Sequence, residues 1–346
     1  MARGMLPLEG DQLNDTPLIE ARHLTKLFTV GAGFLKERRT IRAVDDVSFS
    51  VNEGENVALV GESGCGKSTL GRLTLGLLNP TSGFLLYRGK NISTMDRKEF
   101  REFRRNAQII HQDPYSSINP VRTIFQSLAP AMIQNKIVHN KREAFERAAE
   151  ILSLVGLTPP EDFLRRYPSR MSGGQMQRVI LARAVAVNPD YVVADEAVSM
   201  LDASLRLGAL DLMLDLQKKF GLSYLFITHD FAITRYFVKK GGGKIMVMYL
   251  GSLVEVGGGD SVVQKPLHPY TQALLAAIPI PDPKLTRERE LPKLRSLDVP
   301  KLTDVPSGCK FHTRCPYAEK VCEDKVPELR DVTGRLVACH FAERFT

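Results

Sequence analysis

Eight consecutive residues carry the clearest chemical pattern in this chain. Gly61-Glu62-Ser63-Gly64-Cys65-Gly66-Lys67-Ser68 fits G-x-x-x-x-G-K-[ST], and Thr69 follows it. The glycines let backbone N–H groups point into one concavity that suits the phosphates of a nucleotide. Lys67 adds positive charge to the same oxygens, and the Ser68 hydroxyl is a ligand for Mg²⁺. An apolar strand precedes the pattern and an apolar helix follows it, which favours a nucleotide site over a chance glycine-rich turn.

Predicted nucleotide contacts in this loop are Gly61, Ser63, Gly64, Cys65, Gly66, Lys67, Ser68 and Thr69. We interpret Cys65 as a small residue that fits the loop rather than as a redox group.

A second pattern is an apolar strand that ends in two carboxylates, Tyr191-Val192-Val193-Ala194-Asp195-Glu196. Neighbouring residues on a strand point to opposite faces, so the two acids should have separate roles. Asp195 suits the Mg²⁺ shell, and Glu196 is then free to orient an attacking water.

The elements around these residues alternate between strands and helices. Strands are expected at NVALVG, YVVADE and SYLFITHD, and helices at LGRLTLGLL and LGALDLMLDLQKKF. This order predicts a parallel sheet with both faces covered. Residues 18–30 have the pattern of an edge strand, and KREAFERAAEILSLVG has the 3.6-residue period of a helix.

The order of the motifs resembles that of ABC-type ATPases. The phosphate loop is followed by Gln112, by Ser172-Gly173-Gly174-Gln175 before a helix, by Asp195-Glu196 and by His229. This resemblance covers residues 18–346. It implies an α/β P-loop ATPase core with a mixed sheet, an inserted helical subdomain and an N-terminal antiparallel β part, plus a C-terminal Cys-rich extension.

The resemblance also implies roles for single residues. Phe28 matches the aromatic that stacks on adenine, with Phe34 as a competitor. Gln112 matches the lid glutamine that touches Mg²⁺ and senses the membrane partner. His229 matches the switch histidine that contacts the γ-phosphate and steadies Glu196.

Other matched residues act between two ATPase subunits. Ser172, Gly173, Gly174 and Gln175 form the signature loop, which in the family caps the γ-phosphate held by the opposite subunit. Asp202 matches the loop that crosses the seam of the dimer. Two positions depart from the family pattern, namely Ala197, where Pro is common, and Met176, where close relatives often have Arg. We assign no role to the three glycines at 241–243.

Two further stretches narrow the family. HQDPYSSINP and PLHPYTQALL resemble the ATPases of dipeptide/oligopeptide importers. Within that family, STLGR, HQDPYSSINP and SGGQ resemble the second (F-type) subunit more than the first (D-type). The implied partners are a D-type ATPase, two transmembrane permease subunits and an extracellular or periplasmic substrate-binding protein. The implied location is the cytoplasmic face of the plasma membrane. Oligosaccharides and nickel complexes are the alternative cargoes.

Four cysteines lie close to the C-terminus, with the spacing Cys309-x5-Cys315-x6-Cys322-x16-Cys339. In a chain expected in the cytoplasm they favour a metal site over disulfides. Their loose spacing lacks C-x2-C pairs and suits a [4Fe-4S] cluster, with zinc or no metal as alternatives. The resemblance agrees, because dipeptide-importer ATPases can carry such a cluster in this tail. We expect a structural rather than a catalytic cluster.

We expect three regions along the chain. They are a tail at 1–17, an ATPase domain at 18–265 with its helical subdomain at about 115–185, and a C-terminal extension at 266–346. The extension contains a Pro-rich, charged linker after about Pro279.

Composition sets broad limits. The chain has 346 residues with 43% hydrophobic and 25% charged residues, as globular proteins have. It lacks a membrane-spanning run and a signal-peptide core, which predicts a cytoplasmic chain. The net charge of +8 permits a nucleic-acid partner. The spacing between phosphate loop and signature leaves no room for the arms of a repair-type ATPase, so we expect no nucleic acid.

Overall fold

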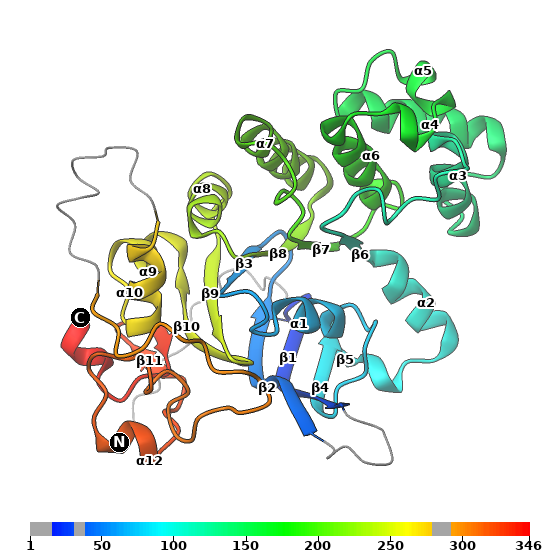
Figure 1. Ribbon diagram of the computed structural model, residues 1–346. Coiled ribbons are helices and arrows are strands. Elements are labelled where there is room, and N and C mark those ends of the chain that lie inside the picture. Colours follow the sequence, from blue (N-terminus) through cyan, green and yellow to red (C-terminus); the bar gives the residue numbers. More distant parts are fainter. Residues whose placement is uncertain (1–15, 31–38, 279–291) are drawn as a thin grey trace, which may run out of the picture.

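The computed structural model describes residues 16–30, 39–278 and 292–346. Most of the expected tail, Phe34 and the start of the linker lie outside the described residues. The chain forms two sheets with helices between and around them, and a separate group of helices lies beyond one sheet edge (Figure 1).

The larger sheet is mixed, in the order β11-β12-β10-β9-β3-β8-β7-β6. Its strands are β3 (Asn56–Val60), β6 (Ala107–Ile110), β7 (Tyr191–Asp195), β8 (Ser223–Thr228), β9 (Lys244–Tyr249), β10 (Ser252–Gly258), β11 (Arg330–Val332) and β12 (Arg335–Val337). The five strands from β9 to β6 are parallel, as the alternating strands and helices predict. β10, β12 and β11 pair antiparallel beyond β9, so β11 and β12 of the extension add strands to the ATPase sheet.

The smaller sheet is antiparallel, with the order β2-β1-β4-β5. Its strands are β1 (Ile19–Val30), β2 (Arg39–Val51), β4 (Ser82–Tyr87) and β5 (Lys90–Asn91). The prediction that β1 is an edge strand was wrong, because β1 lies between β2 and β4. A strand with one half-polar face has the sequence pattern of an edge strand. The two partners of β1 come from later in the chain, so its own residues do not show that it pairs on both sides.

The helices fall into a core set and an outlying group. The core set is α1 (Lys67–Thr74), α2 (Arg97–Asn106), α7 (Ala203–Phe220), α8 (Phe231–Gly241), α9 (Gly259–Gln264), α10 (Pro269–Ala276) and α12 (Lys320–Asp324). The outlying group is α3 (Ile124–Gln134), α4 (Lys141–Leu154), α5 (Pro160–Arg165) and α6 (Gly173–Val185). Short 3₁₀ turns are η1 (Ile92–Thr94), η2 (Pro168–Arg170) and η3 (Ala342–Phe345).

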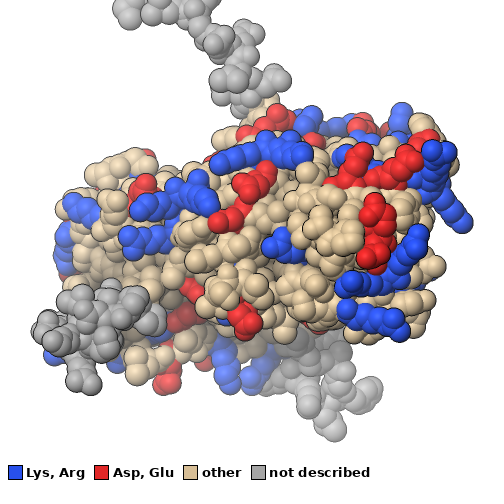
Figure 2. Space-filling view, turned by 90° about the horizontal axis from the view of Figure 1, so that it is seen from above, with Lys and Arg blue, Asp and Glu red and all other residues tan. Residues whose placement is uncertain are grey.

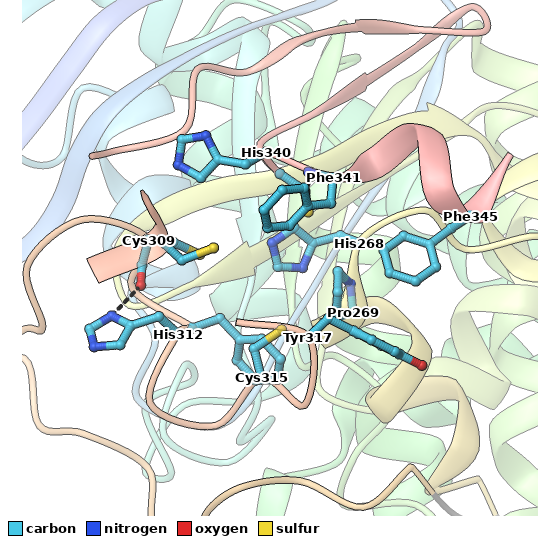
Figure 3. Close-up of a pocket in the computed structure, with 12 residues that line it drawn as sticks. His268, Pro269, Cys309, His312, Cys315, Tyr317, His340, Phe341 and Phe345 are labelled. Carbon is cyan, nitrogen blue, oxygen red and sulfur yellow. Dashed lines mark hydrogen bonds between the residues drawn. The ribbon is translucent and has the colours of Figure 1, made fainter. Parts of the chain in front are cut away.

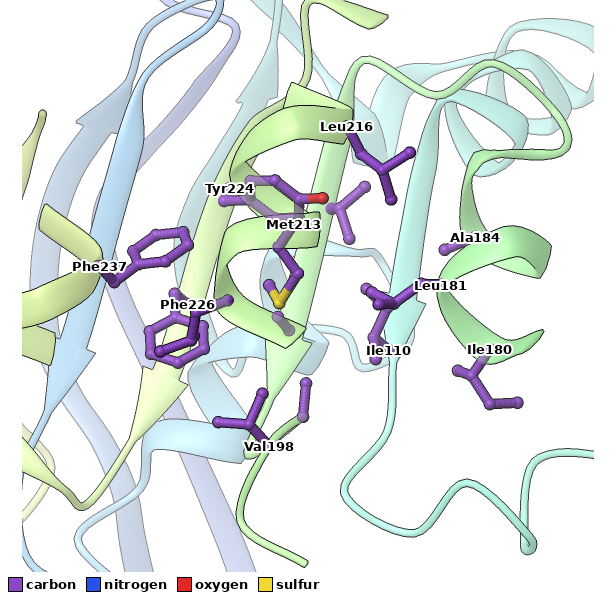
Figure 4. Packing of buried hydrophobic residues seen from close by; sticks show 14 of the residues in the cluster. Ile110, Ile180, Leu181, Ala184, Val198, Met213, Leu216, Tyr224, Phe226 and Phe237 are labelled. Carbon is purple, nitrogen blue, oxygen red and sulfur yellow. The ribbon is translucent and has the colours of Figure 1, made fainter. Parts of the chain in front are cut away.

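Both faces of the larger sheet are buried. Along β3, Ala58 and Val60 belong to one apolar cluster, and Val57 and Leu59 belong to the other. The first cluster lies under α6, α7 and α8, where the Phe226 and Phe237 rings stack with centroids 4.6 Å apart (Figure 4). The second holds α1 against the two sheets. Burying one such side chain contributes about 1.5–3 kcal/mol, so the strand ends are held firmly in place.

The structure gives a reason for the glycine run at 241–243. Gly242 and Gly243 have φ of 71° and 110°, in the turn between α8 and β9. A Cβ on Gly243 would lie 2.0 Å from the carbonyl oxygen of Asn56. The turn therefore packs directly on the start of β3, which a larger residue would prevent.

Within the described residues, no helix has the length and apolar character needed to cross a membrane.

Candidate functional site

The phosphate loop connects β3 to α1 and leaves the start of α1 open. Gly66 precedes α1 with φ of 110°, and a Cβ there would lie 2.0 Å from the carbonyl oxygen of Ala43. Because glycine caps the helix without a side chain, the first N–H groups of α1 are available to an anion. Lys67 Nζ donates to the carbonyl oxygens of Gly61 and Glu62, at 2.8 and 2.9 Å. The loop thus combines amide donors with a cation.

Cys65 is buried under this loop, and burial raises the pKa of its thiol. Its environment is consistent with a packing residue. Ser63, Gly64 and Ser68 face solvent, whereas Thr69 is half-buried.

The two predicted magnesium ligands of the core are neighbours. Ser68 Oγ donates to Asp195 Oδ1 at 2.9 Å, although the residues are 127 positions apart. Burial raises the pKa of Asp195, and the bond from Ser68 opposes this shift. His111, just after β6, is close enough for the two charges to interact. A hydroxyl and a carboxylate are ligands that Mg²⁺ prefers, so the donor set fits this ion.

Glu196 and His229 form the next pair along the same edge. Glu196 Oε1 and His229 Nδ1 are 3.1 Å apart, and 52% of the His229 side chain is exposed. Glu196 has φ of 50°, which is uncommon outside glycine and typical of functional sites. Val60 is in register with Thr228, and Asp195 with Ile227. The carboxyl ends of three parallel strands therefore bring Lys67, Ser68, Asp195, Glu196 and His229 to one edge.

Two predicted contacts lie around this edge. Gln112 is exposed in the loop after β6, the strand next to β7. Phe28 lies on β1, in the smaller sheet, with 36% of its surface exposed and Lys26 Nζ 5.3 Å from its ring centroid. Phe28 has the exposure that a stacking platform needs, and it belongs to a different sheet from the loop.

The signature loop belongs to a different part of the molecule. Ser172 Oγ accepts from Gln175 N at 3.3 Å, and Ser172 N donates to Gln175 Oε1 at 3.1 Å, which forms a capping box on α6. α6 packs on α4, α7 and β6, whereas α1 packs on β1, β2, β7 and β8 (Figure 1). Ser172 and Gly173 are exposed, and Gly174 is half-buried. The signature loop is thus presented outward rather than to the phosphate loop of the same chain.

Asp202 precedes α7 and is exposed. Arg206, which the sequence analysis missed, holds the loop before it, donating to the carbonyl oxygens of Leu201 and Ser199 at 2.7 and 3.2 Å. The two departures from the family pattern, Met176 and Ala197, are buried in the apolar cluster under α6 to α8.

The four C-terminal cysteines line one pocket. Its walls are His268, Pro269, Cys309, Phe311, His312, Cys315, Tyr317, Cys322, Cys339, His340, Phe341 and Phe345. Figure 3 shows the sulfur atoms of Cys309 and Cys315 directed toward the same space. All five cysteines of the chain are free thiols. In the described part of the chain, no three His, Cys, Asp or Glu side chains converge closely enough to hold a metal ion. The four thiols thus line one pocket but do not form a metal-binding group.

Burial raises the pKa of three of these thiols, to about 12 for Cys309 and about 11 for Cys315, and also for Cys339. The other thiolates of the pocket raise it further. The thiols of Cys309, Cys315 and Cys339 are accordingly neutral near pH 7 unless a cation offsets their charge.

The positive charge of the chain is dispersed on the face that Figure 2 shows. Lys and Arg alternate there with Asp and Glu, between broad uncharged areas. On α4, Arg142 pairs with Glu146 and Arg147 with Glu150. This face has no continuous basic stripe of the kind that follows a nucleic-acid backbone.

Comparison with known proteins places the chain in a family. Residues 44–199 match the family described as ABC transporter, and residues 254–322 match the oligopeptide/dipeptide transporter C-terminal region. The probable peptide ABC transporter ATP-binding protein y4tS of Sinorhizobium fredii is 45% identical, over 93% of this chain and 89% of that protein. The oligopeptide transport ATP-binding protein AppF of Bacillus subtilis is 40% identical, over 94% and 98%.

A further relative and a solved structure agree. The di/tripeptide transport ATP-binding protein DppF of Pseudomonas aeruginosa is 41% identical, over 95% of this chain and 98% of that protein. The dimeric structure of the ATP-binding cassette MJ0796, in a post-hydrolysis state bound to ADP and Pi, has a TM-score of 0.60 and 27% identity, over 69% of this chain and 98% of that one. The chain therefore belongs to the ABC transporter family, as an ATPase of the group whose core is joined to the oligopeptide/dipeptide transporter C-terminal region.

Proposed function

We propose that this chain hydrolyses ATP to power a membrane importer of di- and oligopeptides. The observation that carries the proposal is the convergence of Ser68 with Asp195, and of Glu196 with His229, on the sheet edge beside Lys67. The names of its relatives, which are peptide and oligopeptide transport ATP-binding proteins, support the cargo class.

Each residue at the sheet edge and around it has a proposed role. The amides of the loop and Lys67 bind the β- and γ-phosphates, and Phe28 stacks on adenine. Ser68, Asp195 and Gln112 hold Mg²⁺, which neutralises phosphate charge when it is bound. Glu196 accepts a hydrogen bond from the attacking water, and His229 holds the Glu196 carboxylate and contacts the γ-phosphate. Hydrolysis then depends on positioning and charge neutralisation rather than on covalent chemistry.

A second ATPase subunit completes the pocket in this proposal. The outward-facing Ser172, Gly173, Gly174 and Gln175 reach the γ-phosphate of the partner, and Asp202 lies at the seam. MJ0796 forms a dimer in its structure, which supports the arrangement. We propose a D-type paralogue as the partner, with a second copy of this chain as the alternative.

The importer also needs membrane permease subunits, which one face of this chain would contact. Family membership implies membrane permease subunits and a substrate-binding protein. We propose that Gln112 and the helices after it face two permease subunits at the cytoplasmic side of the membrane. Tyr115, Val121 and Tyr167 support this, since 44%, 77% and 43% of their surfaces are exposed in that region. Large exposed apolar side chains are typical of interaction surfaces.

We propose that Cys309, Cys315, Cys322 and Cys339 bind a [4Fe-4S] cluster, with zinc as the alternative. The chemistry of the pocket supports this, because it offers four thiols and no carboxylate in its lining. Bound metal would stabilise the extension and would release protons from thiols whose pKa is raised. Iron and sulfide assays on anaerobically purified protein test the cluster, and a zinc assay tests the alternative.

The function is tested with the importer reconstituted in proteoliposomes. We expect ATP-dependent uptake of labelled di- and oligopeptides, and none when Glu196→Gln replaces the wild-type chain. Labelled oligosaccharide and nickel complexes serve as competing cargoes. Uptake of one of these without peptide uptake would reject the peptide assignment and keep the ATPase assignment.

A further inference from the structure

Glu62, the second residue of the phosphate loop, is held from three directions. Its carbonyl oxygen accepts from Lys67 Nζ at 2.9 Å. Its N–H donates to the hydroxyl of Tyr270 at 2.9 Å. Its carboxylate accepts two bonds from Arg314, Nη1 to Oε2 at 2.8 Å and Nη2 to Oε1 at 3.0 Å. The last two contacts come from the C-terminal extension, 208 and 252 residues further along the chain.

The segment that supplies Arg314 is itself anchored on the ATPase core. Lys310 Nζ donates to Asp45 Oδ2 at 2.7 Å and to the carbonyl oxygen of Leu250 at 2.9 Å. The Phe311 ring lies 5.4 Å from the ring centroids of both Tyr249 and Tyr270. This segment runs from Cys309 to Cys315, so it joins the cysteine pocket to the phosphate loop.

The Arg314–Glu62 pair has the geometry of a strong interaction. It is bidentate, and the exposed fractions of the two side chains are 7% and 25%. Burial lowers the pKa of the Arg314 guanidinium, whereas the hydrogen bonds with Glu62 raise it. The net effect is a pKa above its ordinary value. The guanidinium also lies over the Phe311 and Tyr249 rings. A pair held this rigidly restricts where Glu62 can move.

We infer that Arg314 is a positioning residue for ATP binding, which holds the phosphate loop through Glu62. The mechanical link is short. Arg314 fixes the Glu62 carboxylate, and the carbonyl oxygen of Glu62 is one of the two that contact Lys67 Nζ. Displacement of Glu62 therefore displaces the loop amides and the resting position of Lys67. The extension thereby strengthens the binding of ATP. This inference rests on ATP binding at the loop, which the wild-type titration establishes separately.

The test compares Mg-ATP binding by the full-length wild-type chain with binding by Arg314→Met and Arg314→Lys, using calorimetry. We expect roughly a tenfold weaker Kd for Arg314→Met, since the loop that Arg314 no longer holds must then be ordered when Mg-ATP binds. Arg314→Lys keeps the charge and loses the bidentate geometry, so it should recover part of the affinity. Melting temperatures are measured in parallel.

Arg330→Met is the matched control. Arg330 makes a bidentate pair with Glu343 inside the extension and donates to the carbonyl oxygen of Cys339, beside the cysteine pocket. If weakened binding follows from general damage to the extension, Arg330→Met will weaken it as much as Arg314→Met does. That result, or wild-type affinity in Arg314→Met, would overturn the inference.

Glu62→Gln alone keeps the test decisive if Arg314→Met folds poorly, because it weakens the same pair from the core side and should also weaken Mg-ATP binding. Where Arg314→Met folds, the two substitutions are combined in a double-mutant cycle. An interaction transmitted through Glu62 predicts that the double variant binds Mg-ATP no more weakly than Arg314→Met alone. Multiplicative losses in the double variant would show that Arg314 acts elsewhere. Loss of ATP binding in the wild-type chain would reject the nucleotide site itself, which is a different outcome.

Discussion

The nucleotide site and the cysteine pocket are built in opposite ways. At the first, functional groups sit at the ends of β3, β7 and β8, and the register of three paired strands sets their positions. At the second, Cys309 and Cys315 come from a loop and Cys322 from the five-residue α12. Side-chain contacts, such as those of Phe311 with Tyr249 and Tyr270, hold that region in place.

This difference predicts how each site responds to change. Backbone hydrogen bonds between paired strands hold the catalytic groups in place when one side chain is altered. A substitution at the nucleotide site should therefore lower activity without unfolding the protein. A pocket held by side-chain contacts, with the metal proposed above, would lose stability together with its ligand. Arg314 connects the two sites, because it lies next to Cys315 and pairs with Glu62 of the phosphate loop.

The largest expected effect is at the nucleotide site. Glu196→Gln should lower the rate of ATP hydrolysis by about 10²- to 10⁴-fold, because it removes the group that polarises water. The variant should bind ATP and accumulate as a closed dimer with its partner subunit, seen by size-exclusion chromatography. Glu53→Gln, at an exposed surface pair with Arg88, is the control. Wild-type turnover by Glu196→Gln would refute the assigned role.

The next effect concerns the outward-facing signature loop. Ser172→Ala should reduce hydrolysis by the assembled pair at least about tenfold, since it removes the contact that we propose across the dimer. It also removes the cap of α6, which costs about 1 kcal/mol of folding stability. Mg-ATP binding by the isolated chain should not change. A normal rate with the partner present would contradict the shared pocket.

A smaller effect on nucleotide binding is expected at the pocket. Cys322→Ser should abolish bound iron and sulfide and lower the melting temperature, because the extension loses its metal. Cys322 lies in α12, and its carbonyl oxygen accepts from Cys309 N at 2.8 Å, at the start of the segment that carries Arg314. Lys310 anchors that segment on the ATPase core independently of the cysteines, so the Kd for Mg-ATP should change by less than about twofold. A metal content equal to that of the wild type would exclude Cys322 as a ligand.

The smallest effect is a pH dependence of stability. His268 is completely buried, and burial lowers its pKa from 6.5 to about 3. The unfolded chain binds a proton below pH 6.5 that the folded chain does not, so folding stability falls with decreasing pH between these values. The loss at pH 5.5 is about 1.4 kcal/mol from this group.

His268→Asn isolates this contribution. The His268 side chain caps α10 by accepting from Tyr270 N at 3.0 Å, and Asn is also a good capping residue. Chemical unfolding at pH 7.5 and 5.5 should show a smaller loss in the variant than in the wild type. Equal losses would show that other groups cause the pH dependence.

Much of the nucleotide site was predictable because its information is local. The phosphate loop, the acids at the end of β7 and the histidine after β8 each stand beside a short apolar strand, and parallel strands bring their carboxyl ends to one edge. The predicted parallel core was confirmed. The edge position of β1 was not, since pairing partners are not encoded in the strand itself.

The sequence by itself determined which residues bear chemistry, because a glycine pattern, a strand period and a carboxylate at a strand end are properties of neighbouring residues. Only the tertiary structure decided that Ser172 faces outward, that β11 and β12 join the core sheet, and that Arg314 reaches Glu62. The physical reason is that these contacts depend on side-chain packing between segments far apart in the chain. No local pattern records which arginine of an extension will meet which carboxylate of a loop 252 residues away.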